Sequence, residues 1–398
     1  MRELLEESFR AAVAAADPLR ILAPHLPRPP RGRTFVAAAG KAAASMALAV
    51  EQAWPADAPL DGIAVTRYRH GLATRRVRVV EAGHPVPDEA GVAAAREILS
   101  SVRSLTEDDL LLALLSGGGS SLLSLPADGM PMAELKALTA RLLKSGAAIQ
   151  EMNTVRKHLS AIHGGRLAAA SRAPVLALII SDVTGDEATH IASGPCAPDP
   201  TTIADARAVL AKYRIAFSGP FSETPKPGDA RFARVENRVV ATAYKSLEAA
   251  AEVFRRRGFR PHILGDTITG EAREVGREMA QRALATKGPA ALVSGGECTV
   301  TIENDGGRGG RCAEFLLSLG ISLGGAANVC AIAADTDGID GSEDNAGAVW
   351  LPEFAQRPEA RALLDKHDSY GFFRAAGGLV MTGPTRTNVN DYRAILVS

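Results

Sequence analysis

The chain has 398 residues, of which 46% are hydrophobic and 23% charged, so it is long enough for two or three folded cores and does not have the composition of a disordered protein. Lys plus Arg and Asp plus Glu both number 45, so no overall basic charge indicates binding to nucleic acid or to an anionic membrane. We therefore expect a two-domain protein without a nucleic-acid partner, in which any anion site is local.

The terminus and the cysteines indicate the cellular compartment. The first ten residues, MRELLEESFR, predict an amphipathic helix and lack the basic and apolar regions of a signal peptide. The longest apolar runs, such as residues 111–116 and 175–180, are shorter than the roughly 18 residues of a membrane span. The sparse cysteines form no CxxC pair and are expected to be free thiols: Cys196, Cys298, Cys312 and Cys330. These features predict a cytoplasmic protein with no membrane partner, and they leave the oligomeric state open.

Short apolar runs without polar alternation recur along the chain and predict strands that are buried on both faces. They begin near residues 35, 77, 110, 175, 239, 291, 329 and 379. Helices are predicted between many of them, over residues 41–54, 88–103, 131–150, 154–171, 243–257, 270–286 and 311–323. This alternation predicts an α/β fold. Proline, glycine and polar residues at 215–235 interrupt it and predict a boundary between a domain of residues 1–225 and a domain of residues 226–398.

In doubly wound α/β folds, ligands bind beyond the carboxyl ends of the strands, so the residues after each apolar run are candidate site residues. Lys41 follows the first run and Gly40 at a predicted helix start, where it could meet a phosphate or a carboxylate. The segment is not a Walker A motif, because Phe35 stands where that motif needs glycine and Ala42 replaces its Ser or Thr. An exposed lysine at a helix start is the alternative interpretation.

The segment SGGGSS, residues 116–121, follows the third run. Its three glycines allow several backbone N–H groups to point at one anion, so the segment is a candidate phosphate cradle. It does not complete a dinucleotide fingerprint, because Leu122 stands where the third glycine of GxGxxG belongs. A structural turn is the alternative.

A long predicted loop, SDVTGDEATHIASGPCAPDP, covers residues 181–200 after the fourth run. Loops of this length in compact domains are usually functional. Asp182 and Asp186 could hold Mg²⁺ or orient a substrate hydroxyl, or they could form turns and cap helices. His190 has no second ligand at a metal-binding spacing and is interpreted as an ordinary loop histidine.

The second half of the chain has its own candidates. Glycines flank Arg308 and Arg311 before a predicted helix, which makes this segment the best candidate anion site in the sequence. Glu297 is a carboxylate at another strand end. The segment TGPTRTNVND at 382–391 resembles a ligand loop.

Three aspartates follow the apolar run at 329. They are Asp335, Asp337 and Asp340, and one of them is a candidate base or magnesium ligand. Ile339 occupies a ligand position of an EF-hand frame started at Asp335, so a calcium loop is not indicated. A solvated acidic turn is the alternative.

Taken together, these segments resemble a known family. They are AGK at 39–41, AGHPVPDEAG at 82–91, SGGGSS, SDVTGDEATHIASGPCAPDPTT, GGECTV, GGRCAE, DTDGIDG and TGPTRTNVND. In this order they resemble the glycerate 2-kinase family with a carboxy-terminal MOFRL domain, from about residue 5 to the end. The resemblance implies a Rossmann-like amino-terminal domain, a smaller α/β MOFRL-type domain and an active site in the interdomain cleft. The match has departures: Cys312 and Ala313 stand where the family usually has Asn and Gln, Cys196 where Thr is common, and Asp335 where Gly is usual.

The resemblance implies ATP-dependent phosphorylation of D-glycerate at its 2-hydroxyl, with Mg²⁺. The family's catalytic lysine, arginine and acidic residue fall on Lys41, Arg311 and Asp337. In this interpretation the nucleotide is bound by Ser116, Gly117, Gly118, Gly119, Ser120, Asp182 and Asp186, and D-glycerate is contacted by Arg308, Glu297 and Asn388. The metal ligands are not indicated, and Asp337 could be either the general base or a metal ligand.

Two other functions compete with this one. Some members of the family carry the name hydroxypyruvate reductase, which implies reduction with NAD(P)H, but no GxGxxG follows any predicted strand. A non-catalytic regulator that binds sugar acids would need neither an ATP site nor a proton acceptor.

Overall fold

The computed structural model describes residues 1–302 and 306–398. The chain forms two compact units: unit 1 comprises Met1–Asp17 and Ala241–Ser398, and unit 2 comprises Pro18–Val240. The boundary predicted after residue 225 therefore falls inside unit 2, and the amino-terminal helix belongs to unit 1. No helix in the described part of the chain is long and apolar enough to cross a membrane.

Unit 2 is built on a six-stranded sheet. Its strands are β1 (Thr34–Ala39), β2 (Leu60–Arg67), β3 (Val77–Ala82), β4 (Leu110–Leu115), β5 (Val175–Ile180) and β6 (Val235–Ala241). Their order is β3-β2-β1-β4-β5-β6, and β1 to β5 pair in parallel. This is the order of a Rossmann-like sheet, whose switch point lies between β1 and β4. The parallel α/β fold predicted for this part of the chain is confirmed.

The burial of these strands follows their position in the sheet. β1, β4 and β5 are buried along their whole length, as their continuous apolar sequences predict. At the edge, β3 exposes Arg78. β2 was not predicted, because Asp61 and Gly62 interrupt its apolar sequence.

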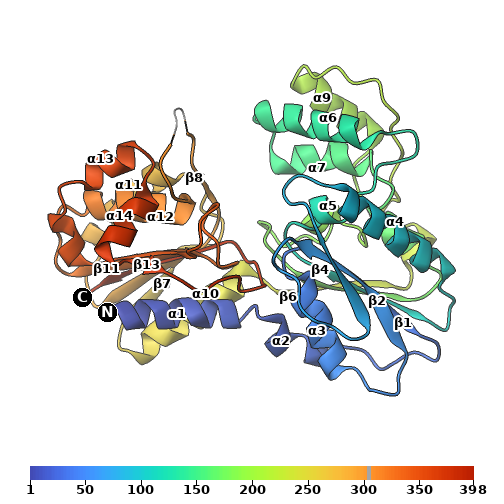
Figure 1. The fold of residues 1–398 in the computed structure, drawn as a ribbon, viewed down its shortest axis with the longest axis horizontal. Helices are drawn as coiled ribbons and strands as arrows, with labels where there is room; N and C mark the ends of the chain where they lie inside the picture. Colours follow the sequence, from blue (N-terminus) through green and yellow to red (C-terminus); the bar gives the residue numbers. More distant parts are fainter. Residues whose placement is uncertain (303–305) are drawn as a thin grey trace. The chain divides into compact units, whose positions relative to one another are not determined.

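The helices of unit 2 flank the sheet or form a separate cluster (Figure 1). They are α2 (Pro18–Ile21), α3 (Ala43–Ala53), α4 (Glu89–Ser104), α5 (Gly119–Leu122), α6 (Met132–Lys144), α7 (Ile149–Lys157), α8 (Arg166–Ala169) and α9 (Ile203–Lys212). The helices α6, α7 and α9 share a small apolar core of their own, which includes Leu138, Val155 and Leu210. The helix predicted over 154–171 was wrong: α7 ends at Lys157 and α8 begins only at Arg166.

Unit 1 contains a mixed sheet. Its strands, in spatial order, are β13 (Leu379–Val380), β12 (Gly347–Trp350), β11 (Val329–Asp335), β14 (Asp391–Val397), β9 (Ala290–Ser294) and β7 (Arg260–Ile263). β14 runs antiparallel to β11 and to β9. A two-stranded ribbon pairs β8 (Gly270–Glu271) with β10 (Cys298–Thr299).

Helices cover both faces of this sheet (Figure 1). They are α1 (Arg2–Ala14), α10 (Ala243–Arg256), α11 (Ala272–Ala285), α12 (Arg311–Ser322), α13 (Ala360–Asp365) and α14 (Ser369–Ala376). The helix α1 packs beside α10, and its Phe9 contacts Tyr392 of the central strand β14 at 5.8 Å between ring centroids. This apolar contact places the amino terminus in unit 1. All four cysteines are buried and unpaired, as predicted.

Candidate active site

The sheet of unit 2 brings Lys41 and the glycine-rich segment together. β1 and β4 pair in parallel with Ala39 opposite Leu115, so the segments that follow these strands leave the sheet side by side. The Lys41 N–H donates to the Gly117 carbonyl oxygen at 2.8 Å, and the Ala42 N–H donates to Ser116 Oγ at 3.1 Å. Lys41 is therefore fixed against residues 116–121, which we call the glycine loop, at the switch point of the sheet.

Glycine is required where the two segments meet. Gly40 has φ +130°, and a Cβ at this position would lie 2.1 Å from Ser116 Oγ and 2.5 Å from the Ser116 carbonyl oxygen. A Cβ on Gly118, at φ +80°, would lie 2.8 Å from His84 Nε2 and 3.5 Å from Lys41 Cγ. The His84 ring and the Lys41 side chain thus lie against Gly118, and a side chain at Gly40 or Gly118 would collide with Ser116 or with His84.

Three backbone N–H groups of the glycine loop are available to donate hydrogen bonds to a ligand. Within the described residues, no hydrogen bond is formed by the N–H groups of Gly117, Gly118 and Ser120. Backbone donors in a glycine-rich turn beside an ammonium are an arrangement that binds phosphate. The predicted role of Ser116 to Ser120 in nucleotide binding stays a prediction, and this geometry is compatible with it.

The opposite side of the glycine loop contacts residues that were not predicted from the sequence. Ser120 Oγ lies 2.8 Å from Ser193 Oγ, Ser193 Oγ donates to Asn153 Oδ1 at 3.3 Å, and Arg156 Nη2 donates to the Ser120 carbonyl oxygen at 3.1 Å. Asn153 and Arg156 lie on α7, and Ser193 lies in the 3₁₀ turn η2 (Ile191–Ser193). The only signal in the sequence was a run of polar residues in a short helix, which is more often a solvent-exposed face.

The long loop after β5 begins at the same edge. Asp182 is the second residue after β5 and is partly buried. Asp186 has φ +54° and closes a turn by donating its N–H to the Val183 carbonyl oxygen at 3.1 Å. His190 is partly buried near Glu187, at 3.5 Å between Nε2 and a carboxylate oxygen. Burial and the Lys157 ammonium lower the pKa of His190.

The predicted residues of unit 1 also meet at one edge of their sheet. Asp335 ends β11 and pairs in register with Asp391, which begins β14. Arg311, the first residue of α12, donates to Asp335 Oδ2 and to Asp391 Oδ1, both at 2.7 Å, and lies 3.1 Å from Glu297 Oε1. Arg393 adds a second guanidinium to Asp391, at 2.7 Å. Three carboxylates therefore surround two guanidinium groups.

In the predicted anion site, the Arg311 guanidinium is already paired with carboxylates of the chain. Burial opposes the charge of Arg311, but the three carboxylates raise the pKa of its guanidinium above the ordinary value. Its N–H groups are directed at carboxylates of the chain itself, so a substrate anion would compete with them. The backbone N–H groups in the first turn of α12 also have partners within the chain. Those of Cys312 and Ala313 donate to the Asp340 carboxylate at 2.9 and 2.8 Å. Burial raises the pKa of Asp340 to about 7.

Asp337 lies in the turn beside this cluster. It is 2% exposed, and its Oδ1 accepts the Ile339 N–H at 2.9 Å. Its own N–H donates to Asp335 Oδ1 at 3.0 Å. Asn388 is also buried, and Asn390 donates its N–H to Asn388 Oδ1 at 3.4 Å. Arg308 is instead exposed, paired with Glu343 and stacked 4.2 Å from the Tyr370 ring centroid.

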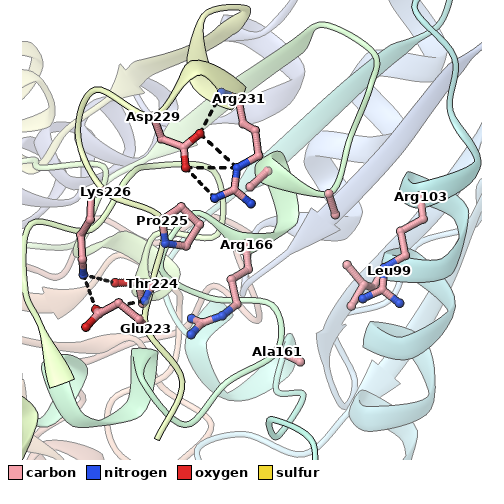
Figure 2. Close-up of a pocket in the computed structure, with 12 residues that line it drawn as sticks. Leu99, Arg103, Ala161, Arg166, Glu223, Thr224, Pro225, Lys226, Asp229 and Arg231 are labelled. Atoms are coloured by element: carbon pink, nitrogen blue, oxygen red, sulfur yellow. Dashed lines mark hydrogen bonds and ion pairs between the residues drawn. The ribbon is translucent and has the colours of Figure 1, made fainter.

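Each unit has a cavity. One of about 240 Å³ is lined by residues that include Arg311, Gly310, Glu314, His367 and Cys298. The other, of about 540 Å³, lies in unit 2 between α4, α8 and residues 223–231 (Figure 2). No predicted site residue lines this second cavity.

No metal site is evident in the described ranges. Among residues 1–302 and 306–398, no group of three or more His, Cys, Asp or Glu side chains is arranged to hold a metal ion. The carboxylates at Arg311 are bridged by guanidinium groups, so they do not form a cation site of their own.

Comparison with known proteins connects both units to one family. A model described as a domain of unknown function, DUF4147, matches residues 4–222, and the MOFRL family model matches residues 290–391. The chain is 39% identical to the glycerate 2-kinase of Pyrococcus horikoshii, over 92% of this chain and 88% of that protein. The chain belongs to the glycerate 2-kinase family. A crystal structure of glycerate kinase from Thermotoga maritima has a similar fold, with a TM-score of 0.87 and 37% identity over 100% of this chain and 99% of that one.

One protein that is similar to this chain has a different name. A protein of Agrobacterium vitis, named provisionally as a hydroxypyruvate reductase, is 51% identical over 100% of this chain and 94% of its own length. The resemblance predicted from the sequence and the two-part α/β architecture with a MOFRL region are confirmed.

Proposed function

We propose that this protein is an ATP-dependent glycerate 2-kinase, which converts D-glycerate and ATP into 2-phospho-D-glycerate and ADP. The observation that carries the proposal is the fixed position of Lys41 against the glycine loop at the switch point of a Rossmann-like sheet. Membership in the glycerate 2-kinase family supports it, and relatives in that family are named glycerate 2-kinase and glycerate kinase.

Phosphoryl transfer requires positive charge and hydrogen-bond donors at the transferred group, and alignment of the two reactants. We assign the nucleotide phosphates to Lys41 and the glycine loop of unit 2, with Asp182 and Asp186 on the nucleotide side. Mg²⁺ would arrive with ATP and neutralise charge on its phosphates, and no step is assigned to a metal held by the protein.

We assign the 2-hydroxyl of D-glycerate to Asp337, which would accept its proton. Arg311 is paired with Asp335 and Asp391, so we infer that it holds these carboxylates in place beside Asp337. Glu297 and Asn388 belong to the same edge and are assigned to substrate contacts, with Arg308 in an outer position.

One assay separates the candidate functions. Purified protein is given D-glycerate, ATP and Mg²⁺ with ADP release as the signal, and hydroxypyruvate with NADH or NADPH with loss of absorbance as the signal. The proposal expects ADP release that depends on D-glycerate and no oxidation of the nicotinamide cofactor. Cofactor oxidation without ADP release would favour the reductase that the name of the Agrobacterium vitis relative suggests. Binding of D-glycerate with neither reaction would favour a non-catalytic regulator.

A further inference from the structure

Arg156 is a cation of unit 2 that has no role in the proposed function. It lies on α7 and is partly buried, and its Nη2 donates to the Ser120 carbonyl oxygen of the glycine loop at 3.1 Å. Among the described residues no carboxylate lies within ion-pair distance of it, and its other guanidinium N–H groups have no partner in the described part of the protein. These nitrogens are not among the fully buried atoms that lack a partner, so they remain accessible to a ligand. A partly buried guanidinium that no carboxylate neutralises, next to a candidate ligand site, can pair with an anionic ligand.

Arg156 lies in a region that contains other positively charged side chains. The fully buried His163 has its pKa lowered to about 3 by burial and by the neighbouring cations Arg156, Arg166 and Lys157. Lys157 is neutralised by a buried ion pair with Asp199 at 3.0 Å, whereas Arg156 has no such partner. Desolvation lowers the pKa of Arg156 to about 10, and no carboxylate offsets this effect.

The same helix face carries Asn153, one turn before Arg156. Asn153 is joined to the glycine loop through Ser193, because Ser193 Oγ lies between Asn153 Oδ1 and Ser120 Oγ. Residues three apart on a helix point in the same direction, so both side chains face the loop. Lys41 lies against the loop at Gly118, so the loop has cations from two separate elements.

We propose that Arg156 binds an oxyanion of the substrates at the glycine loop. The hydrogen bond to the Ser120 carbonyl oxygen fixes the guanidinium, and its remaining N–H groups serve the ligand as a planar fork. A bound phosphate or carboxylate supplies the negative charge that the protein lacks at this position. The proposal rests on the proposed function for the identity of the substrates, but the anion site itself does not depend on turnover.

A matched control is available in the same unit. Arg166 is also partly buried, has a lowered pKa because of burial, and forms no ion pair. It donates to the carbonyl oxygens of Lys157, His163 and Ser222, none of which belongs to the glycine loop. Figure 2 shows Arg166 in the cavity lined by residues 223–231. Its replacement removes a comparable buried guanidinium without touching the loop.

The test measures binding and kinetics of Arg156→Gln and Arg166→Gln. Calorimetry with ATP and with D-glycerate gives the two dissociation constants, and steady-state kinetics gives the two KM values. We expect Arg156→Gln to weaken one ligand by about tenfold or more, which corresponds to about 1.4 kcal/mol, while Arg166→Gln stays within about twofold of wild type. Weakened ATP binding identifies the oxyanion as a phosphate, and weakened D-glycerate binding identifies it as the carboxylate.

Unchanged affinity for both ligands in Arg156→Gln, or an equal loss in Arg166→Gln, would overturn the proposal. Circular dichroism and urea unfolding check that each variant is folded. If Arg156→Gln does not fold, Arg156→Lys replaces it, and near-normal affinity for both ligands in that variant also overturns the proposal. A wild-type protein that binds ATP but does not phosphorylate D-glycerate would refute the proposed function and leave the anion site to be judged by the ATP arm alone.

Discussion

Replacement of Arg311 by Gln should destabilise unit 1 at neutral pH. The side chain of Arg311 is 22% exposed, and it is 2.7 Å from Asp335, 2.7 Å from Asp391 and 3.1 Å from Glu297. Asp391 would keep its ion pair with Arg393, and Glu297 is more than half exposed, so neither carboxylate accounts for most of the lost stability. Asp335, at 2% exposure, would lose its ion pair with Arg311, and breaking a buried ion pair typically costs about 3 to 5 kcal/mol.

The part of the lost stability that comes from Asp391 should also depend on pH. Burial raises the pKa of Asp391, but Arg311 and Arg393 lower it further than burial raises it, so the net shift is downward. A carboxylate with a lowered pKa contributes stability above its unfolded pKa of about 3.9, and this contribution is lost as the pH falls through the folded value. The difference between wild type and Arg311→Gln should therefore shrink in acid.

Urea unfolding followed by tryptophan fluorescence measures this loss. The chain has two tryptophans, Trp54 in unit 2 and Trp350 in unit 1, so a Trp54→Phe background reports on unit 1. With a slope of about 1 to 3 kcal/mol per molar urea, the midpoint should fall by roughly 1 M or more. Arg308→Gln is the control, because its ion pair with Glu343 lies on the surface and should leave the midpoint unchanged. A loss below about 1 kcal/mol for Arg311→Gln, or equal losses in both variants, would refute the reasoning.

Three further predictions concern unit 2. Gly40→Ala should reduce activity strongly, because the new Cβ would lie 2.1 Å from Ser116 Oγ and force the two segments apart; activity near that of wild type in a folded variant would contradict this close contact. Lys41→Ala should lower kcat/KM at least tenfold, about 1.4 kcal/mol, with a much smaller change in the urea midpoint, and retention of more than about a tenth of activity would make Lys41 a bystander. Lys157→Met should lower the free energy of unfolding by about 3 to 5 kcal/mol, because the buried Asp199 loses its partner at 3.0 Å. Urea unfolding of the double variant Lys157→Met, Asp199→Leu should show that most of this stability is recovered. Because Lys157 and hydrogen bonds lower the pKa of Asp199 against the effect of burial, the loss in Lys157→Met should shrink below about pH 4, and a constant loss would contradict the ion-pair explanation.

Continuous apolar sequence was a sufficient signal for the central strands of unit 2. β1, β4 and β5 are buried on both faces, and each of them was predicted from an uninterrupted apolar run. The central strand β14 of unit 1 was missed, because it contains Asp391 and Arg393. These charged residues are buried at 2% and 1% exposure, since they pair with each other and Asp391 also pairs with Arg311. Hydropathy cannot indicate such a strand, because the partners come from other parts of the chain.

The candidate site was predictable only in part for the same reason. Lys41 and the glycine loop follow predicted strands, and the parallel pairing of β1 with β4 brings them together. Arg156 lies on a helix whose polar sequence is typical of an exposed face, and only the packing of α7 against the loop reveals its position. Arg311 was predicted as part of an anion site at a helix start, but its partners Asp335 and Asp391 are distant in the sequence and were not predicted to bind it.

The position of the new phosphoryl group tests the central proposal most directly. The products of D-glycerate, ATP and Mg²⁺ can be examined by proton-coupled ³¹P NMR after complete turnover. A phosphate on carbon 2 has one neighbouring proton and gives a doublet, whereas a phosphate on carbon 3 has two and gives a triplet. We predict a doublet that is absent without D-glycerate and is strongly reduced with Lys41→Ala. A triplet, or no phosphorus signal beyond those of ATP and its hydrolysis products, would contradict the assignment as a glycerate 2-kinase.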